Sequence, residues 1–273
     1  MSYIKKVTRA GRTLITEMHY SSRWNKKNIE RGENCGKTTE AQEKCNERKT
    51  RRDLTVLLNA NFCSDDYHLV LDYRPEERPA TVEEAKENIR TFFRKMRRMY
   101  RKAGIVFQYV EACEFGKKGG LHHHLIIKGG VSTADIARKW PFGRSHFNQL
   151  DDTGEYSRLA SYILKNRKYW KESGGTGKQY SRSRNMVIPQ PKVTIVKTRN
   201  GFYEKPRERK GWRLAPYTEE HGVTGDGWPY MRYILVRDAG SALPGQRGYR
   251  GSQKRSLGGK TKGKSVTRDG KGG

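Results

Sequence analysis

The sequence has few acidic residues, few apolar residues and no long hydrophobic run. Its 273 residues include 29 Asp and Glu against 57 Lys and Arg, which is a formal net charge of +28. No stretch approaches the roughly 20 apolar residues that a membrane-spanning helix needs. No apolar stretch follows the charges of the first twelve residues either, so we expect no secretory signal. These absences predict an intracellular, cytoplasmic protein with no membrane partner.

The sequence shows neither a cysteine-based metal site nor a nucleotide-binding loop. The chain has four cysteines, Cys35, Cys45, Cys63 and Cys113, and their spacings match no zinc pattern. An intracellular location favours reduced thiols over disulfides. No G-x-x-x-x-G-K-[ST] phosphate loop is present, so the sequence carries no recognisable ATPase or helicase motor.

The excess of basic residues predicts a polyanionic partner. Self-repulsion on this scale destabilises a compact state, whereas Lys and Arg release counterions when they bind a phosphate backbone. Nucleic acid is therefore the first candidate, and a ribosome-associated or merely very soluble basic protein is the alternative. Hydrophobic residues are only 33% of the chain, so part of it must stay outside the core. The Gly-, Lys-, Arg- and Ser-rich residues 241–273 predict a flexible, disordered basic tail.

Hydrophobic patterning predicts an α+β fold with a central antiparallel sheet and flanking helices. Apolar runs indicate strands over residues 13–20, 68–73, 105–114, 121–127, 145–150 and 192–197. Helical spacing and capping residues indicate helices over residues 37–61, from 81 to just before Gly104, 132–140 and 155–169. Capping boxes are expected at Thr39 with Gln42 and at Thr81 with Glu84, and Asp152 or Thr153 is expected to cap the last helix. We divide the chain into an N-terminal strand and helix extension (1–61), a central domain (62–200), a C-terminal extension (201–240) and the tail.

A histidine triplet in the strand over residues 121–127 suggests a metal site. Residues i and i+2 of a strand share one face about 6 to 7 Å apart, so His122 and His124 point the same way and His123 points the other way. If the preceding strand pairs antiparallel, Glu114 lies close to His122, and Glu111 falls on the opposite face. A mixed nitrogen and oxygen triad of Glu114, His122 and His124 with open positions suits Mg²⁺ or Mn²⁺. The alternative is that the histidines are ordinary polar side chains on the surface, or make incidental hydrogen bonds.

A tyrosine and a lysine share a face of the helix expected over residues 155–169. Tyr162 and Lys165 are three residues apart, as neighbours on one helix face are. A free tyrosine is a poor nucleophile at neutral pH, and a nearby cation or metal favours its phenolate. The candidates are therefore Tyr162 as a nucleophile and Lys165 as a phosphate contact. We also expect DNA contacts from basic residues of the helix that begins at Thr81 and of the Gly/Lys loop: Arg94, Lys95, Arg98, Lys117 and Lys118.

Three segments in order resemble the motifs of the HUH endonuclease superfamily. They are HLVLDYRP at residues 68–75, EFGKKGGLHHHLII at 114–127 and SYILKN at 161–166. The closest resemblance is to replication-associated proteins of small single-stranded DNA phages and plasmids, of the filamentous-phage gene-two-protein type. It covers about residues 67–170. His123 departs from the pattern, because the residue between the two histidines is normally hydrophobic in this family.

The resemblance implies an HUH nicking domain with a ferredoxin- or RRM-like sheet, helices on one face of the sheet and the tyrosine helix across from the metal. It implies rolling-circle replication initiation by metal-dependent nicking and joining of one DNA strand through a 5′-phosphotyrosine at Tyr162. The expected partners are a single-stranded DNA origin and the helicase and polymerase of a bacterial host. Tyr156 and Tyr169 remain possible assistants in termination. The competing interpretations are a relaxase or transposase with the same chemistry, or a non-catalytic basic nucleic-acid-binding protein.

Overall fold

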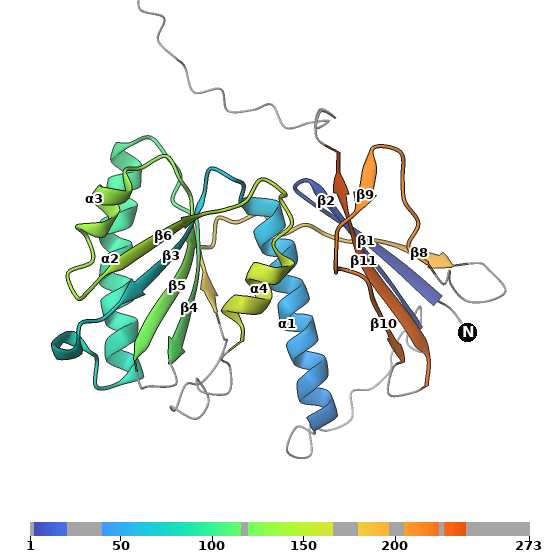
Figure 1. Ribbon diagram of the computed structural model, residues 1–273, viewed down its shortest axis with the longest axis horizontal. Coiled ribbons are helices and arrows are strands. Elements are labelled where there is room, and N and C mark those ends of the chain that lie inside the picture. Colours follow the sequence, from blue (N-terminus) through green and yellow to red (C-terminus); the bar gives the residue numbers. More distant parts are fainter. Residues whose placement is uncertain are drawn as a thin grey trace, which may run out of the picture. The chain divides into compact units, whose positions relative to one another are not determined.

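The computed structural model describes residues 3–20, 40–115, 120–165, 180–196, 205–223 and 227–238. These residues form an α+β fold with two antiparallel sheets and four α-helices (Figure 1). This agrees with the expected fold class. The predicted flexible tail, residues 241–273, lies outside the described residues. None of the helices in the described ranges is long and apolar enough to cross a membrane.

The five-stranded sheet contains the predicted central strands. Its order is β6-β3-β5-β4-β7, and every neighbouring pair is antiparallel. Its strands are β3 (Tyr67–Asp72), β4 (Tyr109–Phe115), β5 (Leu121–Ile127), β6 (Ser145–Gln149) and β7 (Ser181–Arg182). A 3₁₀ turn, η1 (Pro75–Glu77), follows β3. The strand expected over residues 105–114 begins only at Tyr109.

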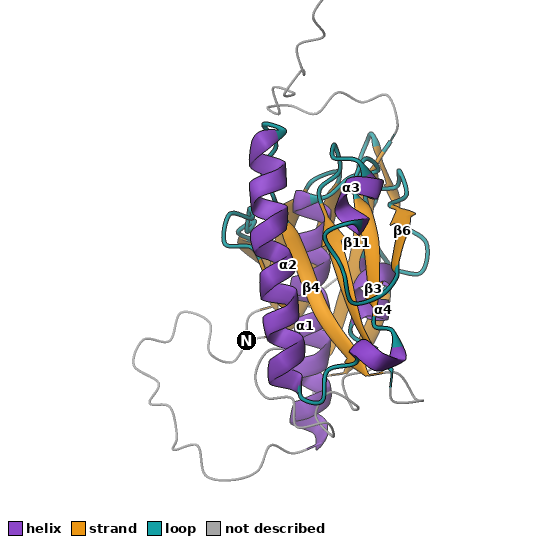
Figure 2. Ribbon diagram, turned by 90° about the vertical axis from the view of Figure 1, so that its left-hand side faces the viewer, coloured by secondary structure: helices purple, strands orange, loops and turns teal. Residues whose placement is uncertain are grey.

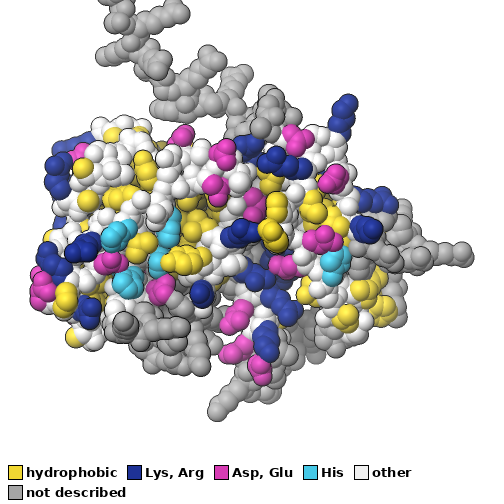
Figure 3. All heavy atoms as spheres, in the orientation of Figure 1, with side chains coloured by type: hydrophobic (Ala, Val, Ile, Leu, Met, Phe, Trp, Pro, Cys, Tyr) yellow, Lys and Arg dark blue, Asp and Glu magenta, His cyan; other side chains and the backbone are white. Residues whose placement is uncertain are grey.

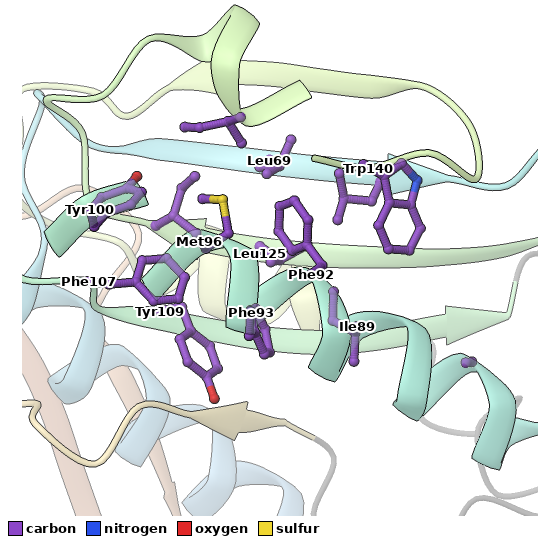
Figure 4. Packing of buried hydrophobic residues seen from close by; sticks show 14 of the residues in the cluster. Leu69, Ile89, Phe92, Phe93, Met96, Tyr100, Phe107, Tyr109, Leu125 and Trp140 are labelled. Carbon is purple, nitrogen blue, oxygen red and sulfur yellow. The ribbon is translucent and has the colours of Figure 1, made fainter. Parts of the chain in front are cut away.

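Helix α2 (Val82–Lys102) covers one face of the five-stranded sheet, and α3 (Thr133–Ala137) follows β5. The apolar residues at helical spacing in α2 are buried against Leu69, Leu71 and Leu125 (Figure 4). The backbone amide of Glu84 donates to Thr81 Oγ at 3.1 Å, so the expected cap is present. Gly104 follows the helix with φ +70°, a conformation that favours glycine.

Helices α1 (Glu40–Asn61) and α4 (Ser157–Ile163) pack on part of the other face. Leu54 and Leu58 of α1 and Ala160 of α4 lie in one buried cluster with Val110 and Ile126 of the sheet. The tyrosine helix α4 thus lies on the face opposite α2, and α1 covers part of that same face. The apolar surfaces of α1 and α4 cover one end of this face. The other end carries polar side chains.

The six-stranded sheet is built from both ends of the described chain. Its path is β10-β11-β2-β1-β8, with β9 also paired to β11. Its strands are β1 (Tyr3–Ala10), β2 (Thr13–Tyr20), β8 (Lys192–Val196), β9 (Trp212–Leu214), β10 (Glu220–Val223) and β11 (Pro229–Arg237). Strand β8 pairs only with β1 among the described strands, as expected for an edge strand. Sequence reasoning missed β1, because its basic residues hide its apolar content.

Helix α1 connects the two sheets. While Leu54 and Leu58 face the five-stranded sheet, Val56 and Ala60 pack against the six-stranded sheet. Asn59 Nδ2 donates to Thr13 Oγ at 3.1 Å, and Asn59 Oδ1 accepts from the backbone amide of Tyr156 at 2.9 Å. One buried amide thus joins the first hairpin to the start of the tyrosine helix. The expected Thr39–Gln42 capping box involves Thr39, which lies outside the described residues.

Helix α4 is shorter than the sequence predicts. It begins at Ser157, and its N-cap position is Tyr156, which makes no side-chain capping bond. Neither Asp152 nor Thr153 caps it. Instead Glu155 Oε1 accepts from the backbone amide of Ser157 at 2.8 Å. The helix ends at Ile163, and residues 166–169 of the expected helix lie outside the described residues.

Gly11 provides a test of how closely α1 approaches the β1–β2 turn. Gly11 has φ +54°, and a Cβ there would lie 2.1 Å from the carbonyl oxygen of Asn59. Gly104 has a similar φ but nothing within 4 Å of its would-be Cβ. We expect Gly104→Ala to lower the free energy of unfolding by about 1 kcal/mol through backbone strain. Gly11→Ala adds a steric clash to that strain, so we expect it to lower the free energy of unfolding by more than about 3 kcal/mol. Equal losses in urea denaturation would contradict the close approach.

Candidate functional site

Antiparallel pairing gathers histidines and carboxylates on one face of the five-stranded sheet. His122 is directly opposite Glu114 of β4 and Asp72 of β3. Because facing residues of an antiparallel pair share a face, these three side chains and His124 project together. His146 of β6 faces Val70 in the same row and adds a third imidazole. Figure 3 shows histidine side chains gathered over this sheet on the side turned to the viewer.

One half of the site is a chain of polar contacts that ends beside a phenol. His124 Nε2 lies 2.7 Å from Glu114 Oε2, and His124 Nδ1 lies 3.2 Å from His68 Nε2. The ring of Tyr162 meets both imidazoles edge-on, with centroids 5.5 Å from His124 and 5.9 Å from His68. Tyr162 is 51% exposed. Helix α4 therefore brings the predicted tyrosine to His124, one of the two predicted histidines, and to His68, while leaving it open to solvent.

The electrostatics of this half favour neutral imidazoles. Burial, and to a lesser extent His124, lowers the pKa of His68 to about 4. Burial also lowers the pKa of His124, and the Glu114 carboxylate opposes that shift. A neutral imidazole keeps a lone pair, which is the form that binds a metal. Both nitrogens of His124 are engaged here, one with Glu114 and one with His68, so a metal bound by His124 would replace one of these contacts.

The other half of the site centres on Asp72. One carboxylate oxygen lies 2.7 Å from His122 Nδ1, and the other lies 3.1 Å from His146 Nε2. With Nδ1 on a carboxylate, the Nε2 of His122 is left as an acceptor, which is how metal-binding histidines are commonly oriented. A Cβ at Gly120 would lie 3.4 Å from that Nε2. Glycine at this position therefore keeps the space in front of the nitrogen open.

His123 belongs to the opposite face and is 1% exposed on its side chain. Its Nδ1 lies 3.1 Å from Glu111 Oε1, and its Nε2 lies 3.0 Å from the Tyr73 hydroxyl. Ser181 Oγ donates to the second oxygen of Glu111 at 2.7 Å. Both ring nitrogens are thereby satisfied within the protein. A histidine in place of the family's hydrophobic residue is thus a structural group in this chain, and Glu111 is its partner, on the face that the alternation predicts.

The donors on the site face fit a divalent metal in their chemistry. They combine carboxylate oxygens, which suit Mg²⁺ and Mn²⁺, with imidazole nitrogens, which suit transition metals. Glu114 and His124 contact one another, and His122 contacts Asp72, so each histidine has a carboxylate partner. Over the described ranges no three His, Cys, Asp or Glu residues converge as a ligand group. The metal triad of Glu114, His122 and His124 therefore stays a prediction.

Three residues of this face were missed as site residues by sequence reasoning: His68, Asp72 and His146. The signal for the first two was present, since a histidine and an aspartate four positions apart in a strand share a face. His146 had no such signal, because its place depends on β6 pairing with β3 rather than with a strand adjacent in sequence.

A family comparison matches this part of the chain. Residues 66–167 match the family model described as replication-associated protein ORF2/gene-two protein. This segment is therefore similar to that replication-associated family. The match begins just before β3, ends just after α4 and contains every side chain of the site face. It confirms the resemblance to the filamentous-phage gene-two-protein type. No curated protein and no solved structure matches the chain.

Within the matched segment, Lys165 lies two residues beyond the end of α4, so the helix expected to carry both Tyr162 and Lys165 ends before the lysine. Its backbone amide donates to the Tyr162 carbonyl at 3.2 Å, and its side chain is exposed. Tyr156 is buried, with its hydroxyl donating to the Asp151 carbonyl at 3.1 Å, and burial raises its pKa. Tyr156 therefore lacks the access that a nucleophile needs. Tyr169 lies outside the described residues.

The predicted DNA contacts divide between two regions. Arg94, Lys95 and Arg98 are exposed on α2, which covers the face of the sheet opposite Tyr162. Lys117 and Lys118 lie outside the described residues. Their role in DNA binding stays a prediction, and any contact of the three α2 residues is remote from the histidine face.

Substitution of His122 and His123 tests the assignment of faces. His123→Leu removes the partner of a buried carboxylate and hydroxyl, so we expect a loss of about 2 to 3 kcal/mol in the free energy of unfolding. Mn²⁺ affinity should stay unchanged. His122→Leu should show the reverse, a small loss of stability and at least about tenfold weaker Mn²⁺ binding. Chemical denaturation and isothermal titration measure the two effects, and an exchange of outcomes between the variants would contradict the assignment.

Proposed function

We propose that this replication-associated protein initiates rolling-circle replication by nicking one DNA strand with Tyr162. The observation that carries the proposal is the edge-on packing of the Tyr162 ring against His124 and His68. A half-exposed phenol beside neutral imidazoles and carboxylates is an arrangement suited to phosphoryl transfer. It also lies within the segment that matches the replication-associated family.

In the proposed reaction, the Tyr162 oxygen attacks the scissile phosphorus. The bond between phosphorus and tyrosine oxygen forms, and the bond to the 3′ oxygen breaks. The phenolic proton is released to solvent, and the departing 3′ oxygen takes up one proton. The products are a 5′-phosphotyrosine and a free 3′-hydroxyl. Reversal of the same exchange joins two ends and restores the tyrosine.

The side chains of the site face would hold and orient the scissile phosphate. Glu114, His122 and His124 would bind a divalent Mg²⁺ or Mn²⁺ ion, which when bound polarises a phosphate and withdraws its charge. Asp72 holds the His122 ring through Nδ1 and thus directs its Nε2 outward. Lys165, one turn after Tyr162, would add positive charge near the phosphate.

The proposed partners follow from the products. The substrate is the single-stranded DNA origin of a phage or plasmid, inside a bacterial host cell. The free 3′-hydroxyl suits extension by a host polymerase, and strand separation requires a host helicase, since the sequence contains no phosphate-loop motif.

Tyr162→Phe tests the nucleophile. Incubation of the wild-type chain with Mn²⁺ and a single-stranded origin oligonucleotide should yield a protein–DNA adduct that survives a denaturing gel. In Tyr162→Phe we expect the adduct to fall below about 1% of wild type, because phenylalanine has no nucleophilic oxygen. Tyr217→Phe, which alters a well-exposed tyrosine outside the site, is the matched control and should keep full yield. An adduct retained by Tyr162→Phe would reject this residue. Its absence from the wild type would favour a non-catalytic DNA-binding protein.

A double substitution of His122 and His124 to Ala tests the metal assignment. Nicking should fall by more than about a hundredfold, because loss of ligands exceeds the effect of losing their hydrogen-bond partners. DNA binding should persist and remain salt-sensitive. His221→Ala, an exposed histidine of the six-stranded sheet, serves as control. Normal nicking by the double variant with added Mn²⁺ would rule out this ligand set.

A further inference from the structure

A basic groove runs along α2 on the side of the five-stranded sheet away from Tyr162. It consists of two hollows of about 540 and 760 Å³ that share Arg97 and Tyr109 as lining residues. Helix α2 forms one wall, and β7 with the residues after it forms the other. Figure 2 shows α2 running alongside β4, and β7 pairs with β4 as the edge strand of the sheet. We call this the α2–β7 groove.

The charge of the groove is strongly one-sided. Seven basic side chains line it: Lys86, Arg90, Arg94, Arg97, Arg101, Arg182 and Arg184. Two acidic side chains line it, and both are already engaged. Glu87 contacts Arg90 and Arg94, and Glu111 contacts His123 and Ser181. The remaining positive charge is therefore available to an external anion.

The arginines of α2 form a regular row. Residues 90, 94, 97 and 101 recur at spacings of four and three, so they lie on one helix face over about 16 Å at 1.5 Å per residue. Arg182 and Arg184 stand on the opposite wall. Within the described residues neither Arg101 nor Arg184 forms an ion pair. Arginine donates two parallel hydrogen bonds to a phosphate, so such a row suits a series of phosphates rather than one.

We propose that the α2–β7 groove binds a second segment of single-stranded DNA through its phosphates, without regard to sequence. Arginines on both walls suit the phosphates of a single strand that follows the groove. Tyr180 is partly exposed in the lining and offers a ring on which a base could stack. The proposal goes beyond nicking, because the sheet separates this groove from Tyr162. A strand held here is not the strand positioned for cleavage.

The test compares two sets of substitutions on the full chain. Arg97→Ala, Arg101→Ala and Arg184→Ala together remove three charges from the groove. Arg9→Ala, Lys192→Ala and Arg213→Ala remove three charges from exposed positions of the six-stranded sheet, away from the groove. The probe is a fluorescent 20-nucleotide oligothymidylate with no origin sequence. It is titrated in EDTA, so that nicking does not contribute, and at several salt concentrations, so that the salt dependence of binding is measured.

The groove variant should bind the probe at least about tenfold more weakly, and the slope of log K against log salt should fall by about 2, at roughly 0.7 per phosphate contact. The control variant should change affinity by less than about threefold, since exposed charges act only through weak, screened fields. Arg97 also contacts Tyr109, so the double variant Arg101→Ala, Arg184→Ala provides a second measurement. For this double variant, the slope of log K against log salt should fall by about 1.4, and the midpoint of thermal unfolding should stay unchanged.

Equal losses of probe affinity in the groove and control variants would overturn the proposal, because binding would then depend on the overall positive charge and not on the groove. Loss of duplex binding with unaffected oligothymidylate binding, or a marked preference for oligouridylate, would also overturn it. Adduct formation on a short origin oligonucleotide should survive the groove substitutions. If the Tyr162 experiment failed, the effect of the groove substitutions on probe binding could still be interpreted, because it does not depend on nicking.

Discussion

The site depends on one constraint, the antiparallel register of β5 between β3 and β4. That register sets His122 opposite both Glu114 and Asp72. A shift of one residue would move every side chain of β5 to the other face. It would bring His123 to the open face and bury its two neighbours beneath α2. The buried network of His123, Glu111 and Tyr73 opposes such a shift, because a slipped strand would leave those polar groups unpaired. The structural histidine of the triplet thus secures the position of the other two.

Placement of the tyrosine depends on a second element, α1, which lies outside the segment that matches the family. Asn59 bonds both to Thr13 in the first hairpin and to the amide at the start of α4. Helix α4 has only seven residues, which is too short to be stable alone. Its orientation therefore comes from packing against α1 and the sheet. The six-stranded sheet, assembled from both ends of the described chain, in turn packs on α1. The parts of the chain beyond the family match thereby support the position of Tyr162.

The two faces of the five-stranded sheet differ in the chemistry they present. One carries imidazoles and carboxylates that contact each other within hydrogen-bond distance, where a phosphate and a metal would meet a phenol. The other is covered by α2, whose outer side and groove concentrate arginine. Under the two proposals above, separation of the histidine face from the basic groove would let one small domain hold two stretches of DNA without competition for the same side chains. The large positive charge of the chain is thus organised around the fold as well as spread over its surface.

Much of the site was predictable because strand alternation is a local property. It placed His122 and His124 on one face and assigned His123 and Glu111 to the other, and helical spacing predicted the buried stripe of α2. The sequence alone could not place His146 beside Asp72 or Tyr162 against His68, since these contacts join residues far apart in the chain. Nor could it reveal β1, whose pairing partners lie in β2 and the distant β8. Local periodicity determined which residues share an element and a face. Only the tertiary structure decided which faces meet, because strand order and helix packing depend on burial summed over the whole chain.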